Sequence, residues 1–265
     1  MTDVLVIGGG PAGLSAALNV RARGKKVLVI SNPLEESPLW RAERVDNCLG
    51  LPGRSGQELL AELRRHAASA GVEFQEGKAQ GALPSGKDWY VSVGSGMVQG
   101  RALVLAAGAV RGKPLPGETE MLGRGLSYCA TCDGMLYRGR KVAVLGYSVS
   151  AKKEAAFLEE IGCDVRYYDR PRTAAILGAN EVEAVRVNGV EEPVEGVFLL
   201  RPAVAPGNLL PGLAVEKGSV VVDRSMATNL SGVFAAGDCT GGPLQISKAL
   251  GEGQIAGLSA AAYVS

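Results

Sequence analysis

Short apolar runs recur along the chain, and several end in a glycine turn that leads into an alanine-rich segment. The first run covers residues 4–7 and precedes the glycine turn at 8–13; an alanine-rich helix and a second apolar run at 26–30 follow. Continuous apolar runs of this length are typical of strands buried in a parallel sheet. The alternation of strand, turn, helix and strand therefore predicts an α/β fold.

Later segments repeat this alternation. The pattern predicts helices at 57–70 and 245–263, strands of a meander at 72–74 and 89–93, and further strands at 102–109, 141–145, 164–168, 220–222 and 232–236. The strand at 141–145, the helix after it and the strand at 164–168 form a second βαβ unit, a weak internal repeat of the first. The chain thus predicts two Rossmann-like dinucleotide-binding domains.

Two crossovers divide the chain. The segment 112–117 is rich in proline and glycine, and Arg201-Pro202 marks the second crossover. The terminal segment returns to the pattern of the first domain. We therefore predict a discontinuous domain at 1–113 and 203–265, with a smaller domain at 114–202 inserted into it.

The composition narrows the functional classes. The 265 residues are 46% hydrophobic and contain 37 glycines, and 28 basic side chains face 27 acidic ones for a net charge of +1. This balance favours neither nucleic acid nor an anionic membrane as a partner. No leader and no apolar run of membrane-spanning length is visible, which predicts a cytoplasmic protein. Because cytosolic thiols are kept reduced, a Cys-x-x-Cys pair there is more often catalytic than structural.

The first glycine turn, Gly8-Gly9-Gly10-Pro11-Ala12-Gly13, fits G-x-G-x-x-G in a strand-turn-helix setting. A helix N-terminus offers free N–H donors to a pyrophosphate, and the glycines allow a close approach. The usual ribose-binding acid at the end of the second strand is replaced by Ser31 and Asn32, with Glu35 as a candidate substitute.

The sequence Tyr-Cys-Ala-Thr-Cys-Asp-Gly at 128–134 contains Cys129 and Cys132 three positions apart, followed by Asp133. A short helical turn brings two such sulfurs within bonding distance and lowers a thiol pKa, which suits a redox dithiol with Asp133 as proton shuttle. Half of a zinc site and a chance pairing are the alternatives. Zinc needs four ligands, but the chain has one histidine, His66, on a predicted solvated helix face, and its other cysteines are isolated. We predict no metal site.

The second glycine turn, at 146–151, is degraded. Gly146 and Ala151 are acceptable, but Ser148 occupies the middle glycine position and Tyr147 precedes it. A side chain at the middle position obstructs the close backbone approach that a pyrophosphate needs. This turn therefore predicts a lost dinucleotide site.

Three stretches together resemble those of the low-molecular-weight thioredoxin reductases. They are Gly-Gly-Gly-Pro-Ala-Gly at 8–13, Cys-Ala-Thr-Cys-Asp-Gly at 129–134 and Gly-Val-Phe-Ala-Ala-Gly-Asp at 232–238. Val-Asp-Asn at 45–47 and Ala-Ala-Gly-Ala at 106–109 add weaker support. The resemblance implies an FAD-dependent homodimer whose inserted domain rotates. It implies that Cys132 faces the flavin, that Cys129 attacks the partner disulfide and that Asp133 shuttles the proton. The implied FAD-binding residues are Gly8, Gly10, Pro11, Ala12, Gly13, Asn47, Ala107, Gly108, Gly237, Asp238, Gln245 and Ile246.

The departures from this family concern the electron donor. The adjacent arginines that bind the NADP 2′-phosphate are replaced by Tyr-Asp-Arg-Pro-Arg at 168–172, and the inserted domain is short. These features resemble the branch that takes electrons from ferredoxin rather than NADPH. We therefore expect a disulfide reductase that acts on thioredoxin or a similar protein. A dithiol oxidase that uses oxygen, an ordinary NAD(P)H-dependent reductase and a non-enzymatic nucleotide-binding scaffold or redox sensor stay open.

Three further residues, Trp40, Cys48 and Cys239, lie near the expected flavin by position, whereas Cys163 ends a helix next to Gly162 and is expected to be inert. Trp40 could shield the flavin or be an ordinary packing residue. Cys48, Cys163 and Cys239 are more simply explained as small buried side chains than as further redox thiols.

Overall fold

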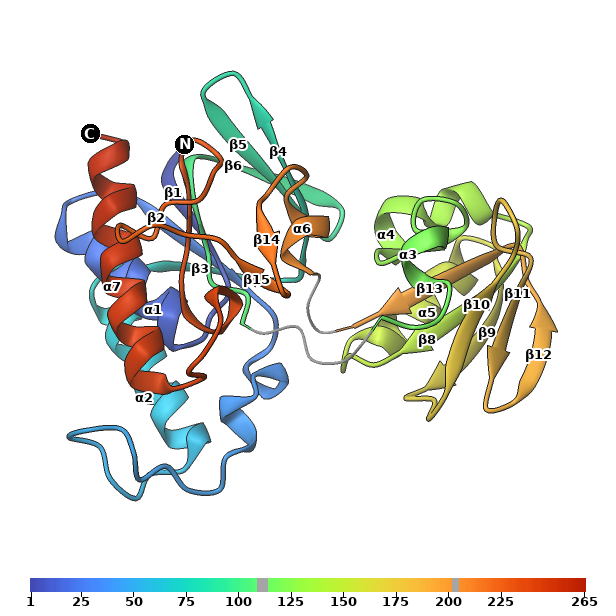
Figure 1. The fold of residues 1–265 in the computed structure, drawn as a ribbon, viewed down its shortest axis with the longest axis horizontal. Helices are drawn as coiled ribbons and strands as arrows, with labels where there is room; N and C mark the ends of the chain where they lie inside the picture. The colour runs from blue at the N-terminus through green and yellow to red at the C-terminus, as the bar shows by residue number, and fades with distance from the viewer. Residues whose placement is uncertain (109–113, 202–204) are drawn as a thin grey trace. The chain divides into compact units, whose positions relative to one another are not determined.

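The computed structural model describes residues 1–108, 114–201 and 205–265, apart from the side chain of Cys132. The chain divides into two compact units, one of residues 1–110 and 203–265 and the other of residues 111–202 (Figure 1). The predicted domain boundaries at 113 and 202–203 and the predicted strand end at Ala109 lie outside the described residues. The exact domain limits therefore stay a prediction.

Unit 1 is built on a mixed sheet in the order β3 (Glu73–Glu76), β2 (Val27–Ser31), β1 (Thr2–Ile7), β6 (Gly96–Leu105), β5 (Asp88–Val93) and β4 (Ala79–Ser85). A further strand, β16 (Val233–Ala235), pairs with β6. Strands β1, β2, β3, β6 and β16 pair in parallel, while β4, β5 and β6 are antiparallel. The predicted apolar runs form the parallel centre because both faces of these strands are covered.

The segment predicted at 72–74 is not part of a meander. Strand β3 pairs in parallel with β2, with Val29 opposite Phe74. The helix α2 (Gly56–Ser69) lies between β2 and β3 in the chain and provides the crossover that a parallel neighbour requires. The 89–93 segment does form a meander strand, β5, as predicted.

Three helices accompany the sheet of unit 1: α1 (Pro11–Ala22), α2 and α7 (Ile246–Tyr263). Helix α7 lies alongside α1 (Figure 1), and its small residues make this approach possible. A Cβ at Gly253 or Gly257 would overlap the backbone of Ala12 or Ala16, respectively. The two helices therefore pack with their backbones close together, as the glycine- and alanine-rich sequence predicts.

Shorter elements complete unit 1. The 3-10 turns η1 (Leu34–Glu36) and η2 (Leu39–Arg41) follow β2, and η4 (Gly237–Thr240) follows β16. The remaining elements are α6 (Pro206–Leu209), β14 (Val215–Glu216) and β15 (Ser219–Val220). The strand predicted at 220–222 is therefore wrong in extent, because only Ser219 and Val220 pair with β14.

Unit 2 contains a parallel sheet in the order β7 (Leu126–Ser127), β13 (Gly196–Leu200), β8 (Lys141–Gly146) and β9 (Asp164–Asp169). Helix α5 (Ala151–Glu160) connects β8 to β9, so the predicted second βαβ unit is confirmed. An antiparallel sheet of β10 (Ala174–Leu177), β11 (Ala184–Val187) and β12 (Val190–Pro193) lies in the same unit. The short elements α3 (Glu118–Met121), α4 (Ala130–Asp133) and η3 (Gly134–Tyr137) complete it. The α/β fold class is confirmed.

Candidate active site

The carboxyl ends of four parallel strands meet at one edge of the unit 1 sheet. The register places Ile7 opposite Ile30 and Leu105, and Ala235 opposite Leu105. The segments that follow these strands contain most of the residues predicted to bind the cofactor. This edge is where open α/β sheets bind their ligands.

The first glycine turn begins at Gly8, directly after β1. Gly8 donates its backbone N–H to the carbonyl of Ile30 at 2.8 Å and has φ of +116°. A Cβ at this position would overlap the carbonyl of Ala106. The turn therefore passes directly over the end of β6, where Ala107 and Gly108 follow, and only glycine fits there.

The N-terminus of helix α1 is open toward solvent. Gly10 is the N-cap, no side chain caps the helix, and Pro11 occupies the first turn. A Cβ at Gly10 would meet nothing within 4 Å, whereas a Cβ at Gly13 would overlap the carbonyl of Gly8. Gly10 thus keeps the surface accessible and Gly13 keeps the turn tight. These residues fit a pyrophosphate, which would accept hydrogen bonds from the N–H groups of the first helical turn.

The corner containing Gly237 and Asp238 lies against the same turn. Gly237 has φ of +84°, and a Cβ there would lie 2.7 Å from the Cβ of Ala12. Ala12 is itself buried on α1. The predicted residues Ala12, Gly237 and Asp238 are therefore brought together by the fold, although more than 220 positions separate them in the chain.

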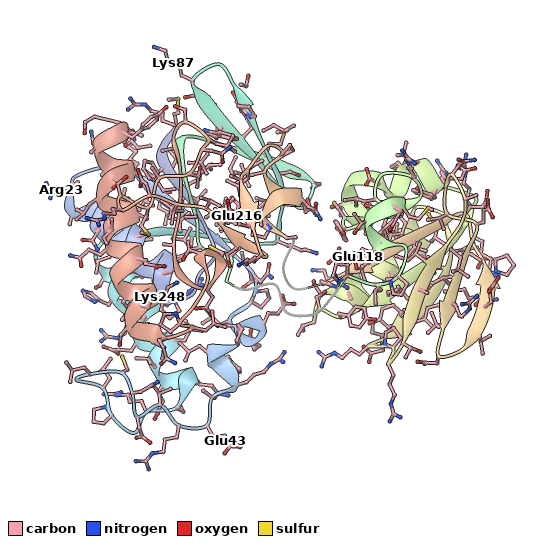
Figure 2. All side chains as sticks on the ribbon, viewed as in Figure 1. Arg23, Glu43, Lys87, Glu118, Glu216 and Lys248 are labelled. Carbon is pink, nitrogen blue, oxygen red and sulfur yellow. The ribbon has the colours of Figure 1, made fainter. Side chains whose placement is uncertain are left out.

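A partly buried ion pair holds this corner on helix α7, where Figure 2 labels Lys248. The Nζ of Lys248 donates to the carbonyls of Gly237 at 3.0 Å and Gly241 at 2.7 Å, and forms an ion pair with Glu252 at 3.0 Å. The carboxylate of Glu252 accepts from the N–H of Gly237 and from Thr240, both at 2.8 Å. Sequence reasoning missed Lys248 and Glu252. Their spacing of four on a helix is the available signal.

The remaining predicted contacts lie at the start of α7. Gln245 is the N-cap of α7, and its Oε1 accepts a hydrogen bond from Nδ2 of Asn47 at 2.6 Å. Ile246 packs against a small cluster formed by Val45, Cys48 and Leu59. Trp40 is partly buried against the main core of unit 1, which is the packing alternative considered for it.

The end of β2 lacks a ribose-binding acid, as the sequence indicates. Glu35, the proposed substitute, is exposed in η1, and Asn32 donates Nδ2 to Glu36 at 2.8 Å. Ser31 is buried, and among the described residues its Oγ has no hydrogen-bond partner. An orphaned buried hydroxyl beside Gly9 fits a bound hydroxyl group at this edge.

The redox segment of unit 2 runs from β7 into α4. Cys129 is buried, directly precedes α4 and is disulfide-bonded, and its sulfur lies 3.5 Å from Oγ1 of Thr131. The predicted partner Cys132 lies in α4, and its side chain falls outside the described residues. Cys48, Cys163 and Cys239 are free, buried thiols. Burial raises the pKa of Cys163, and burial raises that of Cys239 to about 12.

Asp133 is anchored by a serine that sequence reasoning missed. The Oγ of Ser127 donates to Oδ2 of Asp133 at 2.7 Å and accepts from the backbone N–H of Cys129 at 3.0 Å. Ser127 is buried at the end of β7. The fold therefore places the Asp133 carboxylate near the backbone of Cys129. No sequence pattern distinguishes this serine from other serines near a strand.

The degraded second glycine turn is occupied by its own protein contacts. The N–H groups of Tyr147 and Ser148 both donate to the carbonyl of Leu200, at 2.8 and 3.0 Å. Ser148 is buried, and its Oγ lies 3.2 Å from Oγ of Ser150. Ser150 in turn donates to the carboxylate of Glu154 at 3.0 Å. A carboxylate thus lies at the N-terminus of α5, where a pyrophosphate would have to bind.

In unit 2, the buried Glu118 forms an ion pair with the partly buried Arg201. Oε1 of Glu118, labelled in Figure 2, accepts from Arg201 at 2.7 Å and from the hydroxyl of Tyr128 at 3.0 Å. Its Oε2 accepts from the backbone N–H of Leu115 at 2.7 Å. Burial and the charge of Glu118 raise the pKa of Tyr128. The network connects residue 115, residue 201 and the residue before Cys129.

Residues 1–108, 114–201 and 205–265 contain neither a cluster of metal ligands nor a membrane-spanning helix. No group of three or more histidine, cysteine, aspartate or glutamate residues there could hold a metal ion. No helix in the part of the chain that the structure describes has the length and apolar character needed to cross a membrane. His66 is exposed on α2, as predicted.

The two βαβ-containing units and the glycine turn define a dinucleotide-binding α/β oxidoreductase with a disulfide. Residues 2–193 and 204–253 match the family of pyridine nucleotide-disulphide oxidoreductases. The chain belongs to this family and, within it, to the thioredoxin reductases. It is 32% identical to the thioredoxin reductase of Listeria innocua over 99% of this chain and 93% of that protein.

Solved structures agree with this assignment. A ferredoxin-flavin thioredoxin reductase from Clostridium acetobutylicum is similar with a TM-score of 0.90 and 36% identity, covering 99% of this chain and 97% of that one. A thioredoxin reductase from Gloeobacter violaceus has a TM-score of 0.83 and 32% identity, covering 98% and 93% of the two chains. The resemblance stated from the motifs is therefore confirmed. The cofactor is FAD, and the open first glycine turn fits its pyrophosphate.

Proposed function

We propose that this protein reduces the disulfide of thioredoxin or a thioredoxin-like protein through FAD, Cys129 and Cys132, with electrons from ferredoxin rather than NADPH. The observation that supports this electron donor is the set of hydrogen bonds made by the second glycine turn. Its two N–H groups bond to the carbonyl of Leu200, and Glu154 supplies negative charge at the helix end. The N–H groups of Tyr147 and Ser148 are therefore engaged within the protein, and the Glu154 carboxylate disfavours a phosphate at this helix end.

The name of the Clostridium acetobutylicum relative supports the same donor, because that protein is described as a ferredoxin-flavin reductase. The segment at 168–172 adds to the argument. Asp169 ends β9, and the backbone N–H of Arg170 is bonded to the carbonyl of Gly146. An acid at the end of this strand would repel a 2′-phosphate.

The chemistry of the thiol steps follows from disulfide exchange. FAD, when bound, accepts electrons one at a time and delivers them as a pair. Two electrons and two protons convert the enzyme disulfide into the thiols of Cys129 and Cys132. Cys129 first releases its proton to solvent. Its thiolate attacks one sulfur of the partner, and the partner S–S bond breaks as a mixed disulfide forms. The departing partner thiolate takes a proton from Asp133, which regains one from solvent.

The second half returns the enzyme to its starting state. Cys132 attacks the sulfur of Cys129, the mixed disulfide breaks, and the second partner sulfur leaves as a thiol with the proton that Cys132 gave up. We assign Cys129 to the attack because it is the cysteine at the start of the helical turn. We assign FAD contacts to the predicted residues around the first glycine turn and at Asn47, Asp238 and Gln245.

The test is anaerobic mixing of the oxidised protein with NADPH, NADH or reduced ferredoxin while the flavin absorbance is followed. We expect bleaching by ferredoxin, slow or no bleaching by either nucleotide, and reduction of added thioredoxin. The variant Cys129→Ser should bleach but not reduce thioredoxin, while Cys163→Ser serves as the matched control because that thiol is free and buried. Rapid bleaching by NADPH would instead identify an ordinary NADPH-dependent thioredoxin reductase.

Two other results would replace the proposal. Peroxide release with small dithiols and no turnover with thioredoxin would identify a dithiol oxidase. A purified protein without the yellow colour of bound flavin would favour the non-enzymatic nucleotide-binding scaffold or redox sensor. The homodimer and the cytoplasmic location stay predictions, and sedimentation of the purified protein tests the former.

A further inference from the structure

The hydroxyl of Ser127 occupies a position between the two groups that the proposed thiol chemistry uses. It lies 2.7 Å from Oδ2 of Asp133, 3.2 Å from the backbone carbonyl of Cys129 and 3.0 Å from the backbone N–H of the same cysteine. The residue is only 5% exposed, so water does not compete freely for these bonds.

A hydroxyl has one proton to donate and can accept up to two hydrogen bonds. The N–H of Cys129 uses one acceptor site. The single proton of Ser127 can go either to Asp133 or to the carbonyl of Cys129, and both acceptors are within reach. Rotation of one hydroxyl therefore changes which group is bonded without moving any heavy atom.

We propose that Ser127 is a positioning residue that holds the Asp133 carboxyl beside Cys129 in both protonation states. With Asp133 ionised, the hydroxyl donates to Oδ2. With Asp133 protonated, the carboxyl donates to Oγ of Ser127 and the hydroxyl turns to the carbonyl of Cys129. Asp133 can then give its proton to a departing thiolate and regain one from solvent while it stays in place. This inference rests on the proposed disulfide reduction.

The described groups around Asp133 interact with it in different ways. Burial raises the pKa of Tyr137 on η3, and the charge of Asp133 raises it further. Helix α5 presents apolar side chains of Phe157, Leu158 and Ile161 to the adjacent Gly134. The thiol of Cys163 donates to the carbonyl of Gly134 rather than to Asp133. In the described part of the chain, the Ser127 hydroxyl donates a hydrogen bond to the Asp133 carboxylate at 2.7 Å.

The test uses full-length, FAD-loaded protein reduced with dithionite and mixed with oxidised thioredoxin. We expect Ser127→Ala to slow disulfide exchange about tenfold, because the Asp133 carboxyl loses the hydroxyl that holds it beside Cys129. Ser127→Thr keeps a hydroxyl and should restore the exchange rate. Ser92→Ala, in β5, is the matched control.

A coupled variant separates positioning from damage to the fold. In the background Asp133→Asn, the change Ser127→Ala should slow exchange less than about twofold further, because both act through the same carboxyl. An unchanged exchange rate in Ser127→Ala, no rescue by Ser127→Thr, or full additivity with Asp133→Asn would overturn the inference. Failure of the unmodified reduced protein to act on thioredoxin would instead overturn the proposed function.

Discussion

The side-chain amide of Asn47 donates a hydrogen bond to Oε1 of Gln245 at 2.6 Å, although 198 positions separate the two residues. Gln245 is the N-cap of α7, and Asn47 lies in the exposed segment between η2 and α2. The bond fixes this segment against the end of a long helix. Both are among the residues predicted to bind FAD, so the pair connects two segments that we expect at the cofactor.

Loss of either amide is expected to weaken FAD binding. Asn47→Ala and Gln245→Ala should each raise the FAD dissociation constant about fivefold, which corresponds to the ~1 kcal/mol of one hydrogen bond. The double variant should cost little more than either single one, because both changes remove the same bond. Quenching of flavin fluorescence measures the constant. Gln99→Ala, at the opposite end of β6, is the control, and additive effects would contradict the coupling.

The glycine turns and the strand order around them could be predicted because their signals are local. Gly8, Gly13 and the helix after them follow from one short motif, and the structure shows the close backbone contacts that exclude a side chain there. Strand β3 could not be placed in this way. Its four residues give too short a pattern, and its pairing depends on the crossover through α2.

The polar networks around the site could not be predicted either. Glu118 and Arg201 are 83 positions apart, and nothing in their neighbouring residues indicates the partner. Ser127 resembles any serine near a strand until the fold places Asp133 against it. Pairing of this kind is set by tertiary packing, so only the structure reveals these positions.

Two glycines of the first turn are expected to respond differently to alanine. Gly10→Ala should fold normally, because a Cβ there meets nothing within 4 Å, yet it should lose most of its FAD because the methyl group lies on the face open to the pyrophosphate. Gly13→Ala should instead unfold at lower temperature, since its Cβ would overlap the carbonyl of Gly8. Thermal melts of the apoprotein and the ratio of flavin to protein absorbance separate the effects. Equal melting temperatures for Gly10→Ala and Gly13→Ala would contradict these different roles of the two glycines.

The buried pair of Glu118 and Arg201 is expected to be costly to break. Glu118→Gln leaves the Arg201 charge without a counter-charge in a site where the side chains are 7% and 16% exposed. Loss of one partner of a buried pair destabilises by about 3–5 kcal/mol. Hydrogen exchange of the amides in β8 and β13 should report the loss in unit 2.

A neighbouring acid provides the control for this pair. Glu120 is exposed two positions away, and Glu120→Gln should change stability by less than about 0.5 kcal/mol. The double variant Glu118→Leu with Arg201→Met should recover much of the loss, because an apolar pair leaves no unpaired charge. Equal protection in the Glu118→Gln and Glu120→Gln proteins would show that the pair contributes little.

The free thiol of Cys239 is expected to be inert in the folded protein and to make stability fall at high pH. Burial raises its pKa from 9.0 to about 12, so the folded state keeps the proton that the unfolded state releases above pH 9. An acid with a raised folded pKa favours folding below the unfolded pKa, and that contribution declines from pH 9 toward pH 12.

Alkylation followed by peptide mapping should find Cys239 unlabelled in native protein at pH 8 and labelled after unfolding in urea. The variant Cys239→Ala should lose less stability than the parent chain between pH 9 and pH 11. Rapid native labelling of Cys239, or identical pH profiles for the two proteins, would contradict the assignment of this thiol as buried and protonated.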